Sequence, residues 1–327
     1  MNFSKLRTKT IGLLLSSVTA IAVLAAGCGQ KTGTPDGTEN KSGSNAELSY
    51  IVKHAMGETK ITGTPKRIVV LTNEGTEAVL ALGLKPVGAV KSWTGNVWYD
   101  HIKPEMTEVK ELGTEHQPNI EAIAALKPDI ILGNKMRQEK IYSQLSAIAP
   151  TVFSETLRAE WKSNFALYAE ALNKKAEGEK VLADFDKRVE DFRKKAGDKL
   201  ATKVSIVRFM PGKTRIYYKD TFSGLLLSQI GFARPQVQNK DTFADDVTTE
   251  RIPDMDGDIL FYFTWETGNG EAAKLEKEWL ENPLWKNLNV AKNNKVFKVN
   301  DDIWNTSGGV KAANLMLNDL EKFFLNK

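Results

Sequence analysis

The chain has 327 residues, of which 41% are hydrophobic and 26% charged, and its net charge is +4. This length and composition indicate a folded protein of about two domains, and they exclude a disordered chain or a membrane protein with many spans. A single cysteine excludes an internal disulfide and a cysteine-rich metal site, and three scattered histidines do not suggest a metal cage.

The first residues have the features of an export signal. Three basic residues near the start precede a mostly apolar run at 11–26, which is too short and too interrupted to span a membrane. The run ends in LAAGC at 24–28, which resembles the lipobox of bacterial lipoproteins, with Ala25 where a large aliphatic residue is usual. We therefore expect a signal peptide over 1–27 and a lipid on Cys28; an uncleaved signal anchor with an incidental thiol is the alternative.

Cleavage would change the charge and leave a polar linker at the front of the mature chain. Residues 1–27 carry three positive charges and no negative ones, so the remaining chain has a net charge of +1. A nucleic-acid partner is therefore not expected. Residues 29–46 are polar, rich in Gly, Ser and Thr and free of aromatic residues, which predicts a flexible tether over 28–49.

After the tether, short strands and helices alternate. An apolar, β-branched run predicts a first buried strand, and Asn73 can cap a helix that Gly83 ends. The periodicity predicts strands at 67–71, 86–90 and 129–132, and helices at 74–82, 119–126 and 138–148. These units predict an α/β layer with a largely parallel sheet, which forms an N-terminal lobe at 50–157.

A helical segment at 158–200 separates this lobe from a second one. Within it, a helix at 174–196 would extend roughly 34 Å at 1.5 Å per residue. Its apolar residues recur every three or four positions and form one stripe: Val181, Leu182, Phe185, Val189 and Phe192. The rest of the helix is charged, as expected of a solvated surface.

Strand–helix alternation then resumes to the end of the chain. Strands are predicted at 203–209, 258–263 and 295–299, and helices at 222–230, 272–281 and 309–325. We assign 201–306 to a C-terminal lobe and 307–327 to a closing C-terminal helix. The predicted fold is therefore α/β, with two lobes of mostly parallel central sheets joined by one long helix.

Motifs for catalysis are weak or absent. The stretch GNGEAA at 268–273 fits the loose G-x-G-x-x-A form, but a glycine-rich turn explains it as well, and no acidic residue follows at the expected distance. There is no G-x-S-x-G and no H-E-x-x-H, and no nucleophile–base set emerges. We expect no enzyme, no catalytic residue and no metal ligand.

Four stretches of sequence, at 67–91, 118–135, 217–235 and 304–320, resemble one family, as do the two lobes, the connecting helix and the LAAGC motif. The family is that of the substrate-binding lipoproteins of iron–siderophore ABC importers in Gram-positive bacteria. The similarity is nearest to receptors for citrate-based or hydroxamate siderophores. It implies the siderophore-type periplasmic-binding-protein fold, in which two lobes close over a ferric siderophore with modest hinge motion.

The resemblance also implies partners and a location. A lipid-anchored monomer on the extracellular face of the cell membrane would capture a ferric siderophore and deliver it to ABC permease subunits for iron uptake. The ferric chelate brings its own ligands, so no cofactor is expected. A haem or corrinoid receptor of the same fold is the alternative, with His101 as the plausible axial histidine. A surface enzyme on a related two-lobed fold is a third hypothesis.

The chemistry of such a ligand selects candidate site residues. A citrate-type ferric chelate is bulky, oxygen-rich and usually anionic, so guanidinium groups can bind its oxygens and indole faces can pack on its apolar arms. Open α/β sheets bind ligands at strand ends and in the loops that follow. The candidates are Lys91, Trp93, Trp98 and Arg137 in the first lobe, and Arg208, Arg215, Tyr218, Trp265, Trp304 and Asn305 in the second.

Two of these candidates have specific support. Arg137 matches a position where the resembled citrate-siderophore receptors place a ligand-binding arginine; a surface ion pair at a helix start is the ordinary interpretation. Arg208 lies inside an apolar strand, where an arginine is costly unless it is paired or opens onto a cleft. For the aromatic candidates, plain core packing is the ordinary interpretation.

Two glutamates are candidates for docking. Glu77 and Glu250 match the lobe-surface glutamates with which the resembled family binds arginines of its permease. The ordinary interpretation is that a glutamate in the first turn of a helix complements the helix dipole, which contributes about 0.3–1 kcal/mol. Exposed ion pairs are equally weak, so such contacts would set orientation and encounter rate more than affinity.

Overall fold

The computed structural model describes residues 49–325. The predicted signal peptide at 1–27, Cys28 and all but the last residue of the predicted tether lie outside the described residues. In the described part of the chain, no helix combines the length and apolar character needed to cross a lipid bilayer.

The N-terminal lobe is built on a parallel sheet with the strand order β5-β4-β3-β6-β7. Every pairing in this sheet is parallel. Its strands are β3 (Ile68–Val70), β4 (Gly88–Ala89), β5 (Lys110–Glu111), β6 (Ile130–Asn134) and β7 (Thr151–Ser154). Its helices are α1 (Asn73–Ala81), α2 (Ile120–Ala125), α3 (Lys135–Gln138), α4 (Tyr142–Ser146) and α5 (Trp161–Ala171), with short 3-10 turns η1 (Lys103–Met106), η2 (Glu139–Ile141) and η3 (Arg158–Glu160).

The C-terminal lobe is built on a mixed sheet with the order β10-β9-β8-β11-β12. The strands β8 (Val204–Met210), β11 (Ile259–Thr264) and β12 (Val296–Lys298) are parallel, whereas β9 (Lys213–Tyr217) and β10 (Ala244–Val247) are antiparallel. Gly212, at a φ of 67°, lies in the tight turn that reverses the chain from β8 into β9. The other elements are η4 (Gly197–Ala201), α7 (Phe222–Ile230), η5 (Gln236–Gln238), η6 (Thr249–Met255), α8 (Glu271–Glu281), α9 (Pro283–Lys286), α10 (Asn289–Lys292) and a π-helical turn η7 (Asp302–Thr306).

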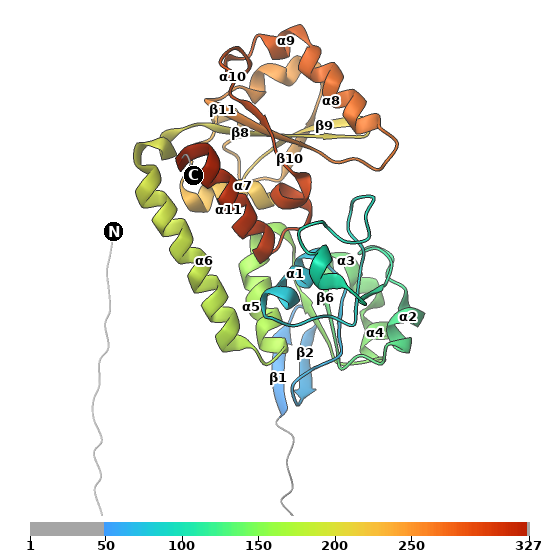
Figure 1. Cartoon of the computed structure of the whole chain (residues 1–327). Helices are drawn as coiled ribbons and strands as arrows, with labels where there is room; N and C mark the ends of the chain where they lie inside the picture. The colour runs from blue at the N-terminus through green and yellow to red at the C-terminus, as the bar shows by residue number, and fades with distance from the viewer. Residues whose placement is uncertain (1–48, 326–327) are drawn as a thin grey trace, which may run out of the picture. The chain divides into compact units, whose positions relative to one another are not determined.

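One long helix, α6 (Lys175–Ala196), runs between the two lobes (Figure 1). It agrees with the predicted helix at 174–196, and Gly197, at a φ of 51°, follows its end. Its apolar stripe is buried at Phe185, Val189 and Phe192, and these side chains belong to one core that also contains residues of both sheets. The last helix, α11 (Val310–Leu325), contacts both α6 and α1, so it ties the end of the chain to the N-terminal lobe.

The sequence did not predict several smaller elements. The antiparallel hairpin of β1 (Ser49–His54) and β2 (Gly57–Thr62) precedes the N-terminal sheet, and β1 begins at the last residue of the predicted tether. The predicted helix at 138–148 is divided into α3, η2 and α4. The division coincides with Gln138, whose buried amide bonds to the backbone of three residues outside α3, so this turn is bound to the sheet edge.

Candidate functional site

A cavity of about 330 Å³ lies between the lobes and is lined by residues of both. Its lining contains Trp93 and Glu115 from the N-terminal lobe and Met210 and Trp265 from the C-terminal lobe. Four arginines also line it, and they come from four different elements: Arg137, Arg158, Arg208 and Arg215. Guanidinium groups from both lobes therefore converge on one cavity, which favours an anionic, oxygen-rich occupant.

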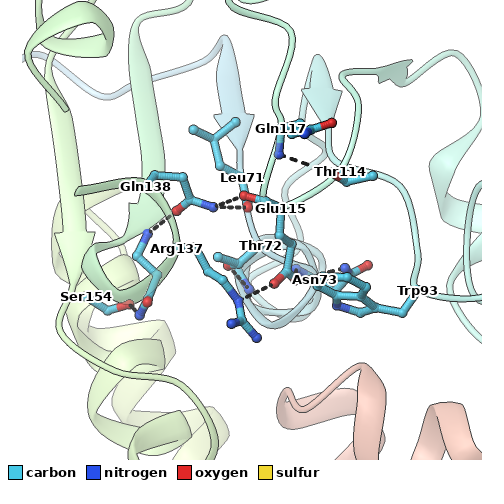
Figure 2. A network of polar contacts seen from close by, with 12 residues as sticks. Leu71, Thr72, Asn73, Trp93, Thr114, Glu115, Gln117, Arg137, Gln138 and Ser154 are labelled. Atoms are coloured by element: carbon cyan, nitrogen blue, oxygen red, sulfur yellow. Dashed lines mark hydrogen bonds and ion pairs between the residues drawn. The ribbon is translucent and has the colours of Figure 1, made fainter. Parts of the chain in front are cut away.

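Arg137 is held in place by a buried polar network at the end of the N-terminal sheet (Figure 2). It follows β6, and its Nε lies 3.2 Å from Glu115 Oε2. The other carboxylate oxygen, Glu115 Oε1, accepts bonds from Asn73 N at 2.8 Å and Asn73 Nδ2 at 2.9 Å, at the start of α1. Gln138 holds the backbone at Glu115 in place, because its Nε2 donates hydrogen bonds to the Glu115 carbonyl at 2.7 Å and to the Leu71 carbonyl at 3.0 Å. The Arg137 guanidinium is thus oriented before any ligand arrives.

Arg208 has an equivalent but more buried setting in the C-terminal lobe. Its Nε and Nη2 bond to the two carboxylate oxygens of Asp301 at 2.7 and 2.9 Å, and its Nη1 donates to the Tyr217 hydroxyl at 3.0 Å. Burial disfavours its charge, but the Asp301 carboxylate and Tyr217 outweigh burial and raise the pKa of Arg208. An arginine in an apolar strand was expected to be paired or to open onto a cleft, and this expectation is confirmed. Arg208 is paired with Asp301 and also lines the cavity.

The two remaining arginines share one aromatic ring. The Arg158 guanidinium lies 3.9 Å from the centroid of the Phe243 ring, and that of Arg215 lies 5.6 Å from it, within cation–π range. Arg215 also bonds to Asp246 through Nε at 2.6 Å. Arg158 has no carboxylate within 4.0 Å among the described residues, and burial lowers its pKa. It is therefore the cavity arginine with the least internal charge compensation.

The sequence did not indicate Arg158 as a ligand-binding candidate, because the strand that precedes it was not predicted. The stretch Thr151–Phe153, directly after Ala149 and Pro150, combines β-branched and aromatic residues and forms most of β7, and Arg158 follows this strand as Arg137 follows β6. The rule that ligands bind beyond the carboxyl ends of parallel strands would have selected it. Its backbone φ of 76° is uncommon for a residue with a side chain and marks the tight turn into α5.

Two tryptophans connect the lobes at this cavity. Trp265 Nε1 donates a hydrogen bond of 2.7 Å to the carbonyl oxygen of Trp93, across the two lobes. Each indole also lies near the arginine of its own lobe, with Arg137 5.8 Å from the Trp93 ring and Arg208 5.7 Å from the Trp265 ring. The structure thus brings together two predicted arginines and two predicted tryptophans, one of each from each lobe.

Four predicted ligand-binding residues lie elsewhere. Tyr218 is fully buried, and its hydroxyl donates a hydrogen bond of 2.6 Å to Asp245 Oδ2. Its neighbour Tyr217 lines the cavity instead, because successive residues of an extended chain point to opposite faces. Trp304 is also fully buried and bonds Asp319 through Nε1 at 3.0 Å, whereas the next residue, Asn305, lines the cavity as predicted. Lys91 and Trp98 are absent from the cavity lining in the described residues.

The two predicted docking glutamates have different settings. Glu77 is fully buried: its Oε1 lies 2.5 Å from His101 Nε2, and its Oε2 accepts a bond of 2.9 Å from Ala312 N in α11. The expected surface position of Glu77 is therefore wrong, because α11 and the loop carrying His101 cover it. Glu250 is exposed on η6, and its docking role stays a prediction.

The structure also bears on metal and haem binding. Within residues 49–325, no group of three or more His, Cys, Asp or Glu side chains is arranged to hold a metal ion. His101 is bound to Glu77 and is stacked on Tyr99, with 5.9 Å between ring centroids. No histidine of the described residues lines the cavity, although Met210 and Tyr217 do.

Comparisons with known proteins found one family model and several similar proteins. The family model described as "Periplasmic binding protein" matches residues 68–303. The chain is 52% identical to the probable siderophore-binding lipoprotein YfiY of Bacillus subtilis, over 97% of this chain and 98% of that protein, and 28% identical to the Fe(3+)-citrate-binding protein YfmC of the same organism, over 95% and 98%. The crystal structure of Staphylococcus aureus SirA complexed with staphyloferrin B superposes with a TM-score of 0.78 at 37% identity, covering 85% of this chain and 98% of that chain.

Proposed function

Because the chain belongs to the periplasmic binding protein family, we propose that it captures an anionic ferric siderophore, of the citrate-based class, and delivers it to an ABC permease for iron uptake. The observation that carries this proposal is the convergence of four arginines from both lobes on one cavity. Two indoles beside the arginines supply apolar faces for the arms of the chelate.

The names of similar proteins support a ferric siderophore, and one of them names a citrate complex. YfiY is named a probable siderophore-binding lipoprotein, YfmC an Fe(3+)-citrate-binding protein, and SirA was crystallised with staphyloferrin B. Carboxylate and other chelating oxygens match the fork geometry of guanidinium groups, so an arginine-rich cavity fits such ligands better than a neutral, wholly apolar ligand.

Intrinsic tryptophan fluorescence provides the direct test, because Trp93 and Trp265 line the cavity. We expect saturable quenching when the protein is titrated with ferric citrate and with citrate-based ferric siderophores, and weaker quenching with ferric catecholates. Absence of quenching by every ferric chelate of the panel would show that the proposed function is wrong. Tight binding of haem with a Soret band would instead support a haem receptor.

The Arg137→Ala variant should bind the proposed ligand at least tenfold more weakly. A hydrogen bond to a charged group contributes about 1.5–3 kcal/mol, and here the guanidinium is already oriented by Glu115. Titration of tryptophan quenching gives the two dissociation constants. The matched control is Arg193→Ala, which removes the same charge from an exposed position on α6 and should leave the affinity unchanged. Equal affinity of Arg137→Ala and the wild type would remove Arg137 from the site.

Attachment to the membrane is proposed through a lipid on Cys28. The LAAGC sequence at 24–28 supports it, and YfiY is itself named a lipoprotein. Mass spectrometry of protein isolated from its native cell would show a chain that begins at Cys28 and carries a lipid. A chain with residues 1–27 attached, or with an unmodified thiol, would contradict the proposal.

Delivery to the permease is proposed to use Glu250. Its exposed carboxylate on η6 can pair with a cationic residue of a membrane partner. Glu250→Gln should reduce uptake of labelled ferric chelate by cells several-fold while the affinity of the purified protein stays unchanged. Glu139→Gln, at an exposed glutamate of the other lobe, serves as the control. Normal uptake with Glu250→Gln would exclude this residue from docking.

A further inference from the structure

Glu74 differs from the carboxylates that pair with the cavity arginines. It is the second residue of α1, is 6% exposed and lines the cavity together with the four arginines. Glu115 is paired with Arg137, and Asp301 and Asp246 hold Arg208 and Arg215. Glu74, by contrast, has no cationic nitrogen within 4.0 Å in the described part of the chain; its Oε1 accepts a bond of 2.7 Å from Asn164 Nδ2 of α5. A carboxylate left without a cation in a cavity rich in arginines requires an explanation.

The surroundings of Glu74 oppose its ionisation. The elements packed around it bring the carboxylates of Glu115 and Glu77 and the hydroxyl of Tyr168, whereas Asn164 and the backbone of Arg158 donate hydrogen bonds to it. Burial is the largest effect and raises the pKa of Glu74 to about 8, with the two neighbouring carboxylates adding to the shift. At neutral pH its carboxyl group is therefore protonated and can donate a hydrogen bond.

The charge balance of the cavity depends on this proton. Three of the four arginines have a carboxylate partner within 4.0 Å, whereas only the more distant Asp220 carboxylate acts on Arg158, so Arg158 supplies most of the available positive charge. An ionised Glu74 would cancel that charge and repel an anionic ligand, whereas a protonated Glu74 leaves the charge available and adds a donor.

We propose that Glu74 is a specificity-determining residue that binds the ferric chelate in its protonated form, so that capture of the anion is coupled to retention or uptake of one proton. The coupling rests on the proposed function. The carboxyl group donates its proton in a hydrogen bond to a chelate oxygen, and the proton returns to solvent when the ligand leaves at high pH. No covalent bond is made or broken in the chelate.

The pH dependence of ferric citrate binding tests the coupling. Dissociation constants of the wild type and Glu74→Gln are measured from pH 6 to pH 9, and their ratio is followed, because the ratio removes the titration of the chelate itself. The two proteins should have about equal dissociation constants at pH 6. Above pH 8 the dissociation constant of the wild type should rise relative to that of the variant, approaching a tenfold increase for each pH unit. Glu139→Gln should follow the wild type at every pH.

A measurement without ligand separates this inference from the proposed function. A raised pKa in the folded state makes ionisation of Glu74 costly to stability as the pH rises from about 4.5, its ordinary value, to about 8. The free energy of unfolding of Glu74→Gln relative to the wild type should therefore increase over that range and level off above it. A constant difference, or a constant ratio of dissociation constants, would overturn the coupling. A wild type that binds no chelate of the panel would overturn the proposed function, and the coupling with it.

Discussion

The Arg208→Met variant should lose about 3–5 kcal/mol of unfolding free energy, because it leaves Asp301 buried without its cationic partner. The side chains of Arg208 and Asp301 are only 9% and 5% exposed, so water cannot replace the lost bidentate contact. Urea denaturation followed by circular dichroism measures the difference. The variant should also lose most of its affinity for the proposed ligand, since Arg208 lines the cavity.

Two further variants separate stability from binding in this prediction. Arg208→Met combined with Asp301→Leu removes both charges, and apolar replacement of a buried ion pair is often neutral, so the double variant should recover most of the stability but not the binding. Arg215→Met is the matched control: its partner Asp246 is 51% exposed, and the loss should stay below about 1 kcal/mol. Equal losses in Arg208→Met and Arg215→Met would contradict the role assigned to burial.

The Trp161→Ala variant should be destabilised by about 3–5 kcal/mol, because a large aromatic side chain would be removed from the centre of the core. Trp161 is fully buried at the start of α5 and packs edge-on against Phe185 of α6, with 5.3 Å between centroids, and against Phe222 of α7 at 6.4 Å. It therefore links α5 of the N-terminal lobe to the long helix and to α7 of the C-terminal lobe. Loss of this contact should lower the unfolding midpoint of both lobes together.

Two substitutions at tryptophan test this interpretation. The Nε1 atom of Trp161 has no hydrogen-bond partner among the described residues, so the expected loss comes from packing and Trp161→Phe should cost much less than Trp161→Ala. Trp98→Ala removes a partly exposed indole from a small satellite cluster and should cost less still. A single thermal transition with a lowered midpoint in Trp161→Ala would agree with a contact that both lobes share, whereas separation into two transitions would contradict the expected joint loss. A loss below 1 kcal/mol in Trp161→Ala would contradict its central role.

Features that depend on local periodicity were predictable from the sequence. The apolar stripe of α6 recurs every three or four residues, and both the helix and its buried face agree with the prediction. The sequence also predicted that Arg137 follows a strand and that Arg208 lies within one. A charged residue next to an apolar run has few stable arrangements, which makes such positions predictable. Very short strands such as β5, with two residues, carry too little pattern to be recognised.

Features that depend on contacts between distant segments were not predictable. Tyr217 rather than Tyr218 reaches the cavity because of the register in which β9 pairs with β8 and β10. Glu77 was expected at the surface of the lobe, yet its carboxylate is buried and bonds to the backbone of Ala312 in α11, 235 positions further along the chain. The pairing of Trp93 with Trp265 likewise joins residues 172 positions apart.

The two α/β lobes, the connecting helix and the arginines near strand ends could be predicted from sequence, since they depend on the spacing of apolar and charged residues along short segments. Which of those side chains share the cavity depends on the packing of segments that are distant in the chain. Among the described residues that line the cavity, Arg158 is the arginine with no carboxylate within 4.0 Å and Glu74 is buried with no cation within that distance, because burial and charge compensation depend on neighbours in space and not on neighbours in sequence.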